Sequence, residues 1–211
     1  LPHIHGVCWI TKKELSERKI EGDLMDNEKA ALKLADELIS CALPEDQHNL
    51  RDIVSEVQRH KHTKSCLKYD GVCRYGFPKL PSPRTVLSKP LELSHPKLTE
   101  KERSTKKAKA SKILSDAKKL LVDIDEKERI KKKSKASKTL SDAEKLLMDT
   151  NSDENMTLEE FYAAISTNEI EYIEALQISE RGKVLVLKRK INERNINNYS
   201  PEMILAWNAN M

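Results

Sequence analysis

Apolar and polar positions in the first third of the chain predict a short strand followed by two amphipathic helices. Residues 1–10 are rich in β-formers and have the character of a buried strand. Apolar residues at helical spacing then predict a helix that is capped by Asp26 or Asn27 and ends near residue 42. A second helical stripe covers residues 50–57, and we expect His60 to continue it by one turn.

The rest of the chain predicts an extended segment, two short helices, a strand and a last helix. Residues 74–96 are rich in proline and basic groups, so we expect them to run extended across a surface. The later pattern predicts helices over 158–165 and 169–178 and a strand over 183–188. A final helix is expected from Ser200, with Ser200 as its N-cap and a proline at its first helical position.

An internal duplication separates these two parts. Residues 101–126 and 127–152 align at a period of 26 residues with 17 identities. Each copy places apolar residues at helical spacing, which predicts one amphipathic helix per copy: Ala110, Leu114, Ala117 and Leu121, then Ala136, Leu140, Ala143 and Leu147. Two copies are too few for a solenoid, so we interpret them as a duplicated, lysine-rich spacer. The chain then divides into residues 1–96, 97–152 and 153–211.

The net charge of +4 conceals two basic blocks. Residues 56–90 carry a net +6 and residues 97–149 a net +7, whereas residues 1–55 and 150–211 are each at −4. A localised basic block is typical of nucleic-acid binding. The chain has no phosphate-binding glycine loop, no Gly-x-Ser-x-Gly elbow and no His-Glu-x-x-His, so the sequence does not support an ATPase motor, a serine hydrolase or a zinc protease.

The first candidate site contains four potential metal ligands within fourteen residues. His60, His62, Cys66 and Cys73 combine nitrogen and sulfur in a way that suits a tetrahedral Zn²⁺. No Cys-x2-Cys pair is present, and the alternative is a loop with free thiols beside a helix C-terminus. The four cysteines of the lysine-rich chain suit metal binding or free thiols better than disulfides, which favours a reducing compartment.

Cationic and aromatic residues surround this cluster. The cations could neutralise phosphates and the aromatics could stack on the bases of single-stranded DNA, while the alternative is a solvated charged loop. The candidate DNA-binding residues are Arg59, Lys61, Lys64, Lys68, Arg74, Tyr75, Lys79 and Arg84.

The second candidate site is the pair His3 and His5. Residues two apart in a strand point to the same side, so the two imidazoles could converge on one Mg²⁺ or Mn²⁺ that polarises a phosphate. The alternative is two histidines at a strand end, because the His-x-His spacing is a weak signal by itself.

Three stretches, in the same order, resemble one family. LPHIHGVCWI, VQRHKHTKSCLKYDGVCRYGFPKLPSPRTV and VLVLKRKINERNINNYSPEMILAWNANM are similar to the helitron helicase-like (Rep) domain of helitron-type transposons. The LPHIHG segment resembles the two-histidine HUH motif of rolling-circle replication initiators. The resemblance implies an α+β fold: an incomplete HUH-type antiparallel sheet with packed helices, a small Cys/His zinc-like insert and the lysine-rich spacer.

The resemblance also implies a mechanism for the family. A tyrosine hydroxyl attacks a phosphate of single-stranded DNA and forms a 5′-phosphotyrosine, while the metal at the histidine pair offsets the developing charge. None of the tyrosines at 69, 75, 162, 172 and 199 matches the family's nucleophile motif, so no residue is assigned a catalytic role. The family's helicase module is likewise expected outside this chain, which begins at Leu1 and is interpreted as a fragment.

Three functional hypotheses follow. The first is a fragment of a nuclear rolling-circle nickase and strand transferase that does not cleave DNA by itself. The second is a non-catalytic, zinc-stabilised DNA-binding remnant of a transposon. The third, a purely structural helical protein based on residues 97–152, leaves the histidine pair and the Cys/His cluster unexplained.

Overall fold

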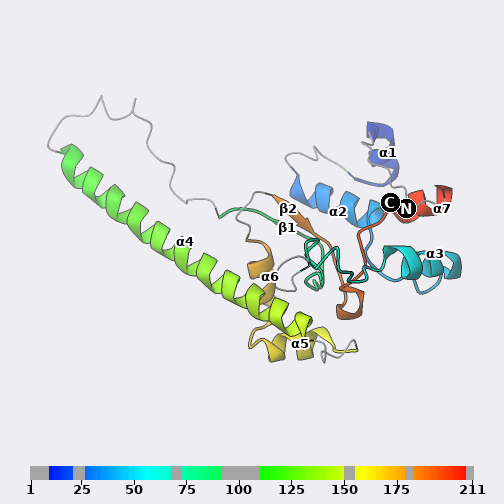
Figure 1. Ribbon diagram of the computed structural model, residues 1–211. Coiled ribbons are helices and arrows are strands. Elements are labelled where there is room, and N and C mark those ends of the chain that lie inside the picture. Colours follow the sequence, from blue (N-terminus) through cyan, green and yellow to red (C-terminus); the bar gives the residue numbers. More distant parts are fainter. Residues whose placement is uncertain are drawn as a thin grey trace.

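The computed structural model describes residues 10–20, 27–67, 73–91, 110–149, 155–178 and 183–207, without the side chains of residues 110–125 and Trp207. Within these ranges the chain is α+β, with seven α-helices and one two-stranded antiparallel sheet (Figure 1). The predicted strand over residues 1–10, with His3 and His5, lies outside the described residues except for Ile10.

Local sequence explains the first helices. Helix α1 (Lys12–Glu17) begins with a capping box between Thr11 and Glu14, and α2 (Glu28–Leu38) is capped by the Asn27 side chain, which accepts from the Ala30 amide at 3.1 Å. The prediction of a cap at Asp26 or Asn27 is confirmed. Helix α1 was not predicted, although its Thr-x-x-Glu sequence is a helix-start signal.

The second predicted helix differs at its end. Helix α3 (His48–Ile53) continues as the π-helix η1 (Val54–Gln58), so the buried stripe runs through Leu50, Val54 and Gln58. Because the wider π turns end at Gln58, His60 follows the helix in an extended segment. The expectation that His60 continues the helical stripe is therefore wrong.

The sheet joins two segments that are far apart in sequence. Strand β1 (Val86–Ser88) pairs antiparallel with β2 (Val184–Val186), with Val86 opposite Val186. The proline-rich segment before β1 is extended as predicted, but it is not confined to the surface, since Pro81, Ser82 and Thr85 are buried.

The duplicated sequence forms one long helix rather than one helix per copy. Helix α4 (Ala110–Met148) runs through the junction between the copies, where no glycine or proline interrupts it. Its C-terminal half packs against α6, and its N-terminal half extends away from the rest of the described chain (Figure 1). No helix of the described residues is both long and apolar enough to cross a membrane.

Short elements complete the chain. Helices α5 (Leu158–Ala164) and α6 (Glu169–Leu176) are capped by Thr157 and Asn168. The 3-10 turn η3 (Ile191–Glu193) follows β2, and α7 (Pro201–Trp207) begins after Ser200, whose hydroxyl accepts from the Met203 amide at 3.5 Å. The predicted capping role of Ser200 is confirmed.

Three hydrophobic clusters stabilise this arrangement. The largest combines β1, the second repeat copy, α5, α6 and η3, through buried residues that include Val86, Ala143, Leu147, Phe161 and Tyr172. A second joins α3 and η1 to the C-terminal residues Ile196, Tyr199 and Ile204. The third consists of Cys66, Cys73 and Phe77 and contains the candidate site. The second repeat copy therefore contributes directly to the core.

Candidate metal centre

The segment between η1 and β1 brings four potential ligands together. His60, His62, Cys66 and Cys73 each offer one ligand atom, and these four atoms all lie within 4.8 Å of one another. Cys73 Sγ lies 3.3 Å from His60 Nε2, and Cys66 Sγ lies 3.7 Å from His62 Nδ1. This group could hold a metal ion.

The spacing of the ligand atoms fits a tetrahedral zinc site. Zn–S bonds of about 2.3 Å and Zn–N bonds of about 2.0 Å give a tetrahedron with edges of roughly 3.3 to 3.8 Å. The Cys73–His60 and Cys66–His62 atom pairs already have such separations. The remaining pairs would need to approach by about 1 Å or less to reach the upper value.

A turn and a narrow hairpin position the two cysteines. The amide groups of Cys66 and Leu67 both donate to the Thr63 carbonyl at 3.1 Å, which closes a turn around Lys64 and Ser65. Leu67 then pairs with Cys73, and the Arg74 amide donates to the Cys66 carbonyl at 2.9 Å. The two cysteines therefore become neighbours across the hairpin even though six residues separate them in sequence.

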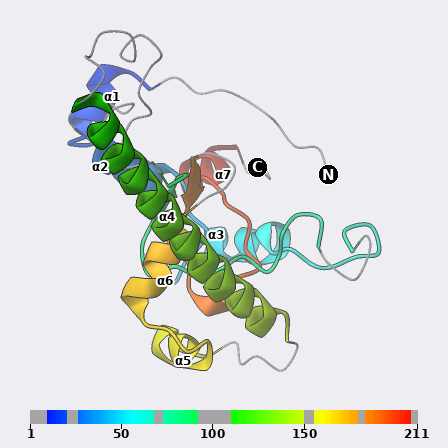
Figure 2. The ribbon, with the colours of Figure 1, turned by 90° about the vertical axis from the view of Figure 1, so that its left-hand side faces the viewer.

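The C-terminal part of the chain holds both ends of this segment. Arg59 pairs with Ile196, and the His60 amide donates to the Asn195 carbonyl at 2.7 Å. At the other end, the Lys79 amide donates to the Arg194 carbonyl at 2.8 Å. Between these anchors the segment projects from the side of the molecule (Figure 2). The two ends of the segment are thus fixed to the C-terminal part of the chain, and its outer surface is exposed.

Local contacts favour the protonation states that bind metals. The Thr63 amide donates to Cys66 Sγ at 3.1 Å and lowers the pKa of this thiol, against the opposing effect of burial. Burial lowers the pKa of His60, and the neighbouring His62 and Lys79 lower it further. Thiolate and neutral imidazole are the forms that bind Zn²⁺. Thr63 contributes here without having been singled out in the sequence, and only its place three residues before Cys66 indicates its role.

Phe77 forms the inner wall of the cluster. Its ring stacks on the His60 imidazole, with centroids 4.3 Å apart and an interplanar angle of 11°, and its side chain is only 3% exposed. Lys79 Nζ lies 4.8 Å from the Phe77 ring centroid and donates to the Tyr75 carbonyl at 2.7 Å. The packing fixes the orientation of one ligand ring.

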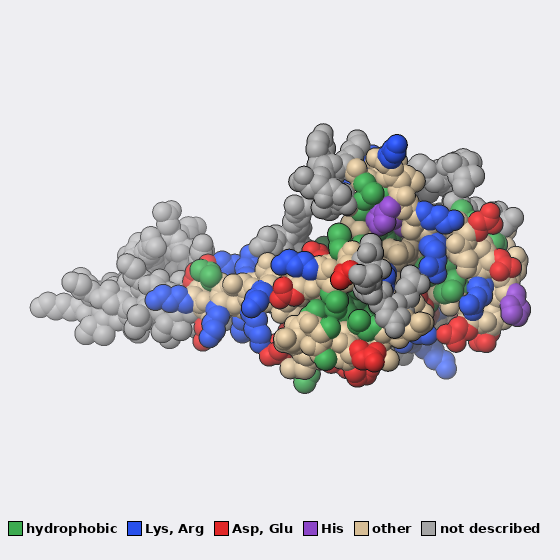
Figure 3. Space-filling model, turned by 60° about the horizontal axis from the view of Figure 1, so that its bottom comes forward, with side chains coloured by type: hydrophobic (Ala, Val, Ile, Leu, Met, Phe, Trp, Pro, Cys, Tyr) green, Lys and Arg blue, Asp and Glu red, His purple; other side chains and the backbone are tan. Residues whose placement is uncertain are grey.

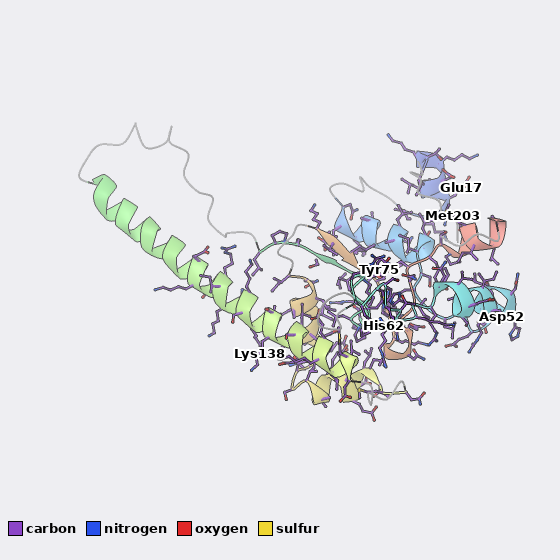
Figure 4. The ribbon with its side chains drawn as sticks, viewed as in Figure 1. Glu17, Asp52, His62, Tyr75, Lys138 and Met203 are labelled. Atoms are coloured by element: carbon purple, nitrogen blue, oxygen red, sulfur yellow. The ribbon has the colours of Figure 1, made fainter. Side chains whose placement is uncertain are left out.

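Four of the predicted cationic and aromatic residues lie exposed on this segment. Lys61, Lys64 and Arg74 are exposed, and Tyr75 is 51% exposed. The Arg74 guanidinium lies 4.6 Å from the centroid of the Tyr75 ring and donates to the Tyr75 hydroxyl. His62 and Tyr75 are labelled in Figure 4, where both lie in the looped segment of the main body.

The other predicted residues are placed differently. Arg59 and Lys79 are half-buried at the two ends of the segment, where their backbones make the anchoring contacts. Arg84 is exposed in the bend before β1, and no contact with the His/Cys cluster is found for it in the part of the chain described. Lys68 and the histidine pair at residues 3 and 5 lie outside the described residues.

Three tyrosines and the third cysteine of the described residues have buried, structural environments. Burial raises the pKa of Tyr162, Tyr172 and Tyr199, and the hydroxyls of Tyr172 and Tyr199 donate to backbone carbonyls at 3.0 and 2.7 Å. Of the tyrosines described, only Tyr75 is exposed. Cys41 is 1% exposed and donates to the Lys188 carbonyl at 3.1 Å, away from the four-ligand group.

Comparisons of the chain with family models, curated proteins and solved structures return no match. The features that indicate a function are therefore the His/Cys cluster and the surface around it.

Proposed function

We propose that His60, His62, Cys66 and Cys73 bind one structural Zn²⁺, which holds residues 59–79 as a binding element for single-stranded DNA. The observation that carries this proposal is the convergence of two imidazoles and two thiols within 4.8 Å. Four protein ligands leave no open coordination position, so the metal has a structural rather than a catalytic role.

The outer surface of the segment supplies the DNA chemistry. Lys61, Lys64 and Arg74 are exposed cations that can neutralise phosphates. Tyr75 offers an exposed ring for a base to stack on, and the Arg74 guanidinium beside it adds a second flat, cationic surface. Cations and an aromatic ring on one loop are the features by which proteins bind single strands with little sequence preference.

Metal content tests the zinc part of the proposal. We expect the purified chain to carry one zinc per molecule by elemental analysis, and Cys66→Ser with Cys73→Ser to abolish it. Cys41→Ser is the matched control, because Cys41 lies outside the ligand group and should retain the metal. A wild-type chain that binds no zinc, or a double variant that retains it, would refute the site.

Binding of a fluorescent oligonucleotide tests the DNA part. We expect Lys61→Gln, Arg74→Gln and Tyr75→Ala together to weaken binding of single-stranded DNA, with stacking alone contributing roughly 1 to 3 kcal/mol. The control combines Lys12→Gln with Lys29→Gln, two exposed cations on α1 and α2. If the triple variant bound the oligonucleotide as tightly as the wild type, the proposal that this surface binds DNA would be refuted.

A second function, that of a helitron Rep nickase fragment, is favoured by the His-Ile-His sequence at residues 3–5. In this proposal His3 and His5 bind Mg²⁺ or Mn²⁺ beside the phosphate to be cleaved, a helicase module acts with the domain in the longer protein, and the protein works in the nucleus. We expect no covalent adduct between this chain and labelled single-stranded DNA in Mn²⁺, because none of its tyrosines matches the family's nucleophile motif. A metal-dependent adduct that disappears in His3→Ala with His5→Ala would contradict that expectation.

A further inference from the structure

Helix α4 carries a row of unpaired lysines on its outer side. Lys127, Lys131 and Lys138 are exposed, and within the part of the chain that the structure describes none of them forms an ion pair. Figure 3 shows Lys and Arg side chains along the projecting helix and further cations on the same face of the main body, near a histidine.

Helical geometry aligns the three lysines. An α-helix turns by about 100° per residue, so positions 127, 131 and 138 fall within roughly 40° of one another and span about 16 Å along the axis. The buried residues Ala136 and Ala143 lie about 120 to 180° around the helix from this row. Because these alanines face α6, the lysine row points away from the core.

Several neighbouring charges on α4 are already engaged. Arg129 pairs with Glu126, and Lys145 lies 3.8 Å from Asp142. Lys135 pairs with Glu171 of α6 at 2.6 Å, so this lysine attaches the helix to the body. Lys132 is also exposed without an ion pair among the described residues, but it lies about 140° around the helix from Lys127 and lines a pocket together with residues of α6. The three lysines of the outward row form a linear set of unpaired cations, which fits a linear polyanion.

We propose that Lys127, Lys131 and Lys138 bind backbone phosphates of single-stranded DNA and form a second contact surface beside the zinc-stabilised segment. This inference rests on the proposed function, since it assigns to α4 the same ligand as the His/Cys segment. It also changes the role of the duplicated sequence: the second copy buries one face in the core and presents the opposite face to DNA.

The salt dependence of binding tests this surface on the full chain. The affinity for a fluorescent single-stranded oligonucleotide is measured from low to moderate salt for the wild type and for Lys127→Gln, Lys131→Gln and Lys138→Gln together. Each phosphate contact on a single strand contributes about 0.7 to the slope of log Kobs against log salt, so the triple variant should have a slope smaller by about 2. Glutamine has nearly the helix propensity of lysine, and circular dichroism checks that α4 remains folded.

A matched control separates this effect from net charge. Lys12→Gln, Lys29→Gln and Lys183→Gln remove the same charge from exposed positions outside α4 and should leave the slope nearly unchanged. If the α4 variant keeps the wild-type slope while Lys61→Gln, Arg74→Gln and Tyr75→Ala lose affinity, the α4 surface is refuted and the proposed function stands. If the wild type does not bind single-stranded DNA at low salt, both are refuted.

Discussion

Tyr162 and Tyr172 are in contact in the main core, but only one of their hydroxyl groups is hydrogen-bonded within the described chain. The rings of Tyr162 and Tyr172 lie 5.4 Å apart between centroids, and both side chains are buried. The Tyr172 hydroxyl donates to the Pro81 carbonyl at 3.0 Å, whereas the Tyr162 hydroxyl has no partner among the described residues. A buried hydroxyl without a partner loses its hydration and gains no hydrogen bond in return.

Substitution of each tyrosine by phenylalanine should therefore have different effects on stability. We expect Tyr172→Phe to lower the free energy of unfolding by about 1 kcal/mol, because it leaves the Pro81 carbonyl without its donor. Tyr162→Phe should be neutral or stabilising by up to about 1 kcal/mol, because it removes an unsatisfied group. Urea unfolding of both variants measures the difference, and a larger loss for Tyr162→Phe would contradict it.

The stability of the folded chain should also depend on Tyr162 at high pH. Burial raises the pKa of Tyr162 from its ordinary value of 10 to about 12, and Glu169 and Glu159 add to the rise. Between pH 10 and 12 the unfolded chain then loses this proton while the folded chain keeps it, so the contribution of Tyr162, complete below pH 10, decreases as pH rises. Thermal unfolding over this pH range should therefore show that the wild type loses stability faster than Tyr162→Phe. Parallel pH profiles of the two proteins would contradict a raised pKa at Tyr162.

At the scale of elements, the two repeat copies in α4 lie in different surroundings. In the second copy, Ala136, Ala143 and Leu147 are buried, and the first two are small enough to let α4 approach α6 closely. The N-terminal half of the same helix extends beyond the main body in Figure 1. Most of the stability of a helix in a protein comes from packing, so the contact with α6 should stabilise α4 more than its intrinsic propensity does.

Among the described side chains of this helix, Leu147 should be the most sensitive large one. Its side chain is 4% exposed, so Leu147→Ala should cost about 2 to 5 kcal/mol through lost burial and a residual cavity. The adjacent Met148 is 47% exposed, and Met148→Ala should change stability by about 0.5 kcal/mol or less. Chemical denaturation of the pair measures the contrast. Similar losses for both variants would show that α4 does not pack as described.

At the scale of the whole molecule, the C-terminal segment unites parts that are distant in sequence. Residues 194–197 hold both ends of the His/Cys segment through backbone contacts to Arg59, His60 and Lys79. The small cluster of Cys66, Cys73 and Phe77 is separate from the two larger clusters. The proposed metal would therefore stabilise a local unit that is attached to a separately packed core.

Removal of the proposed zinc should loosen this unit and leave the core intact. After chelation, we expect amide hydrogen exchange to accelerate in the turn and hairpin around Cys66 and Cys73, while α6 and the β1–β2 pair keep their protection. Added zinc should restore the slow exchange. Equal acceleration in α6 and in the hairpin would show that the metal, if bound, supports the entire fold.

The sequence alone determined the features that depend on near neighbours. The caps at Asn27 and Ser200 and the helices after them were predicted because a cap needs only the following three residues. The four ligands between residues 60 and 73 were also predicted, since their side-chain chemistry and close spacing suffice to suggest a metal site. The Mg²⁺ or Mn²⁺ pair at residues 3 and 5 stays a prediction, because it lies outside the described residues.

Tertiary structure decided what depends on distant partners. The pairing of Arg59 with Ile196 spans more than a hundred residues, and the burial of the proline-rich segment depends on β2 and α6. Likewise, Lys135 pairs with α6 while Lys138, one turn further, remains free of ion pairs in the described chain. Both lysines have the same intrinsic chemistry. Only the packing of α4 against α6 determines which one holds the helix to the core and which one stays exposed.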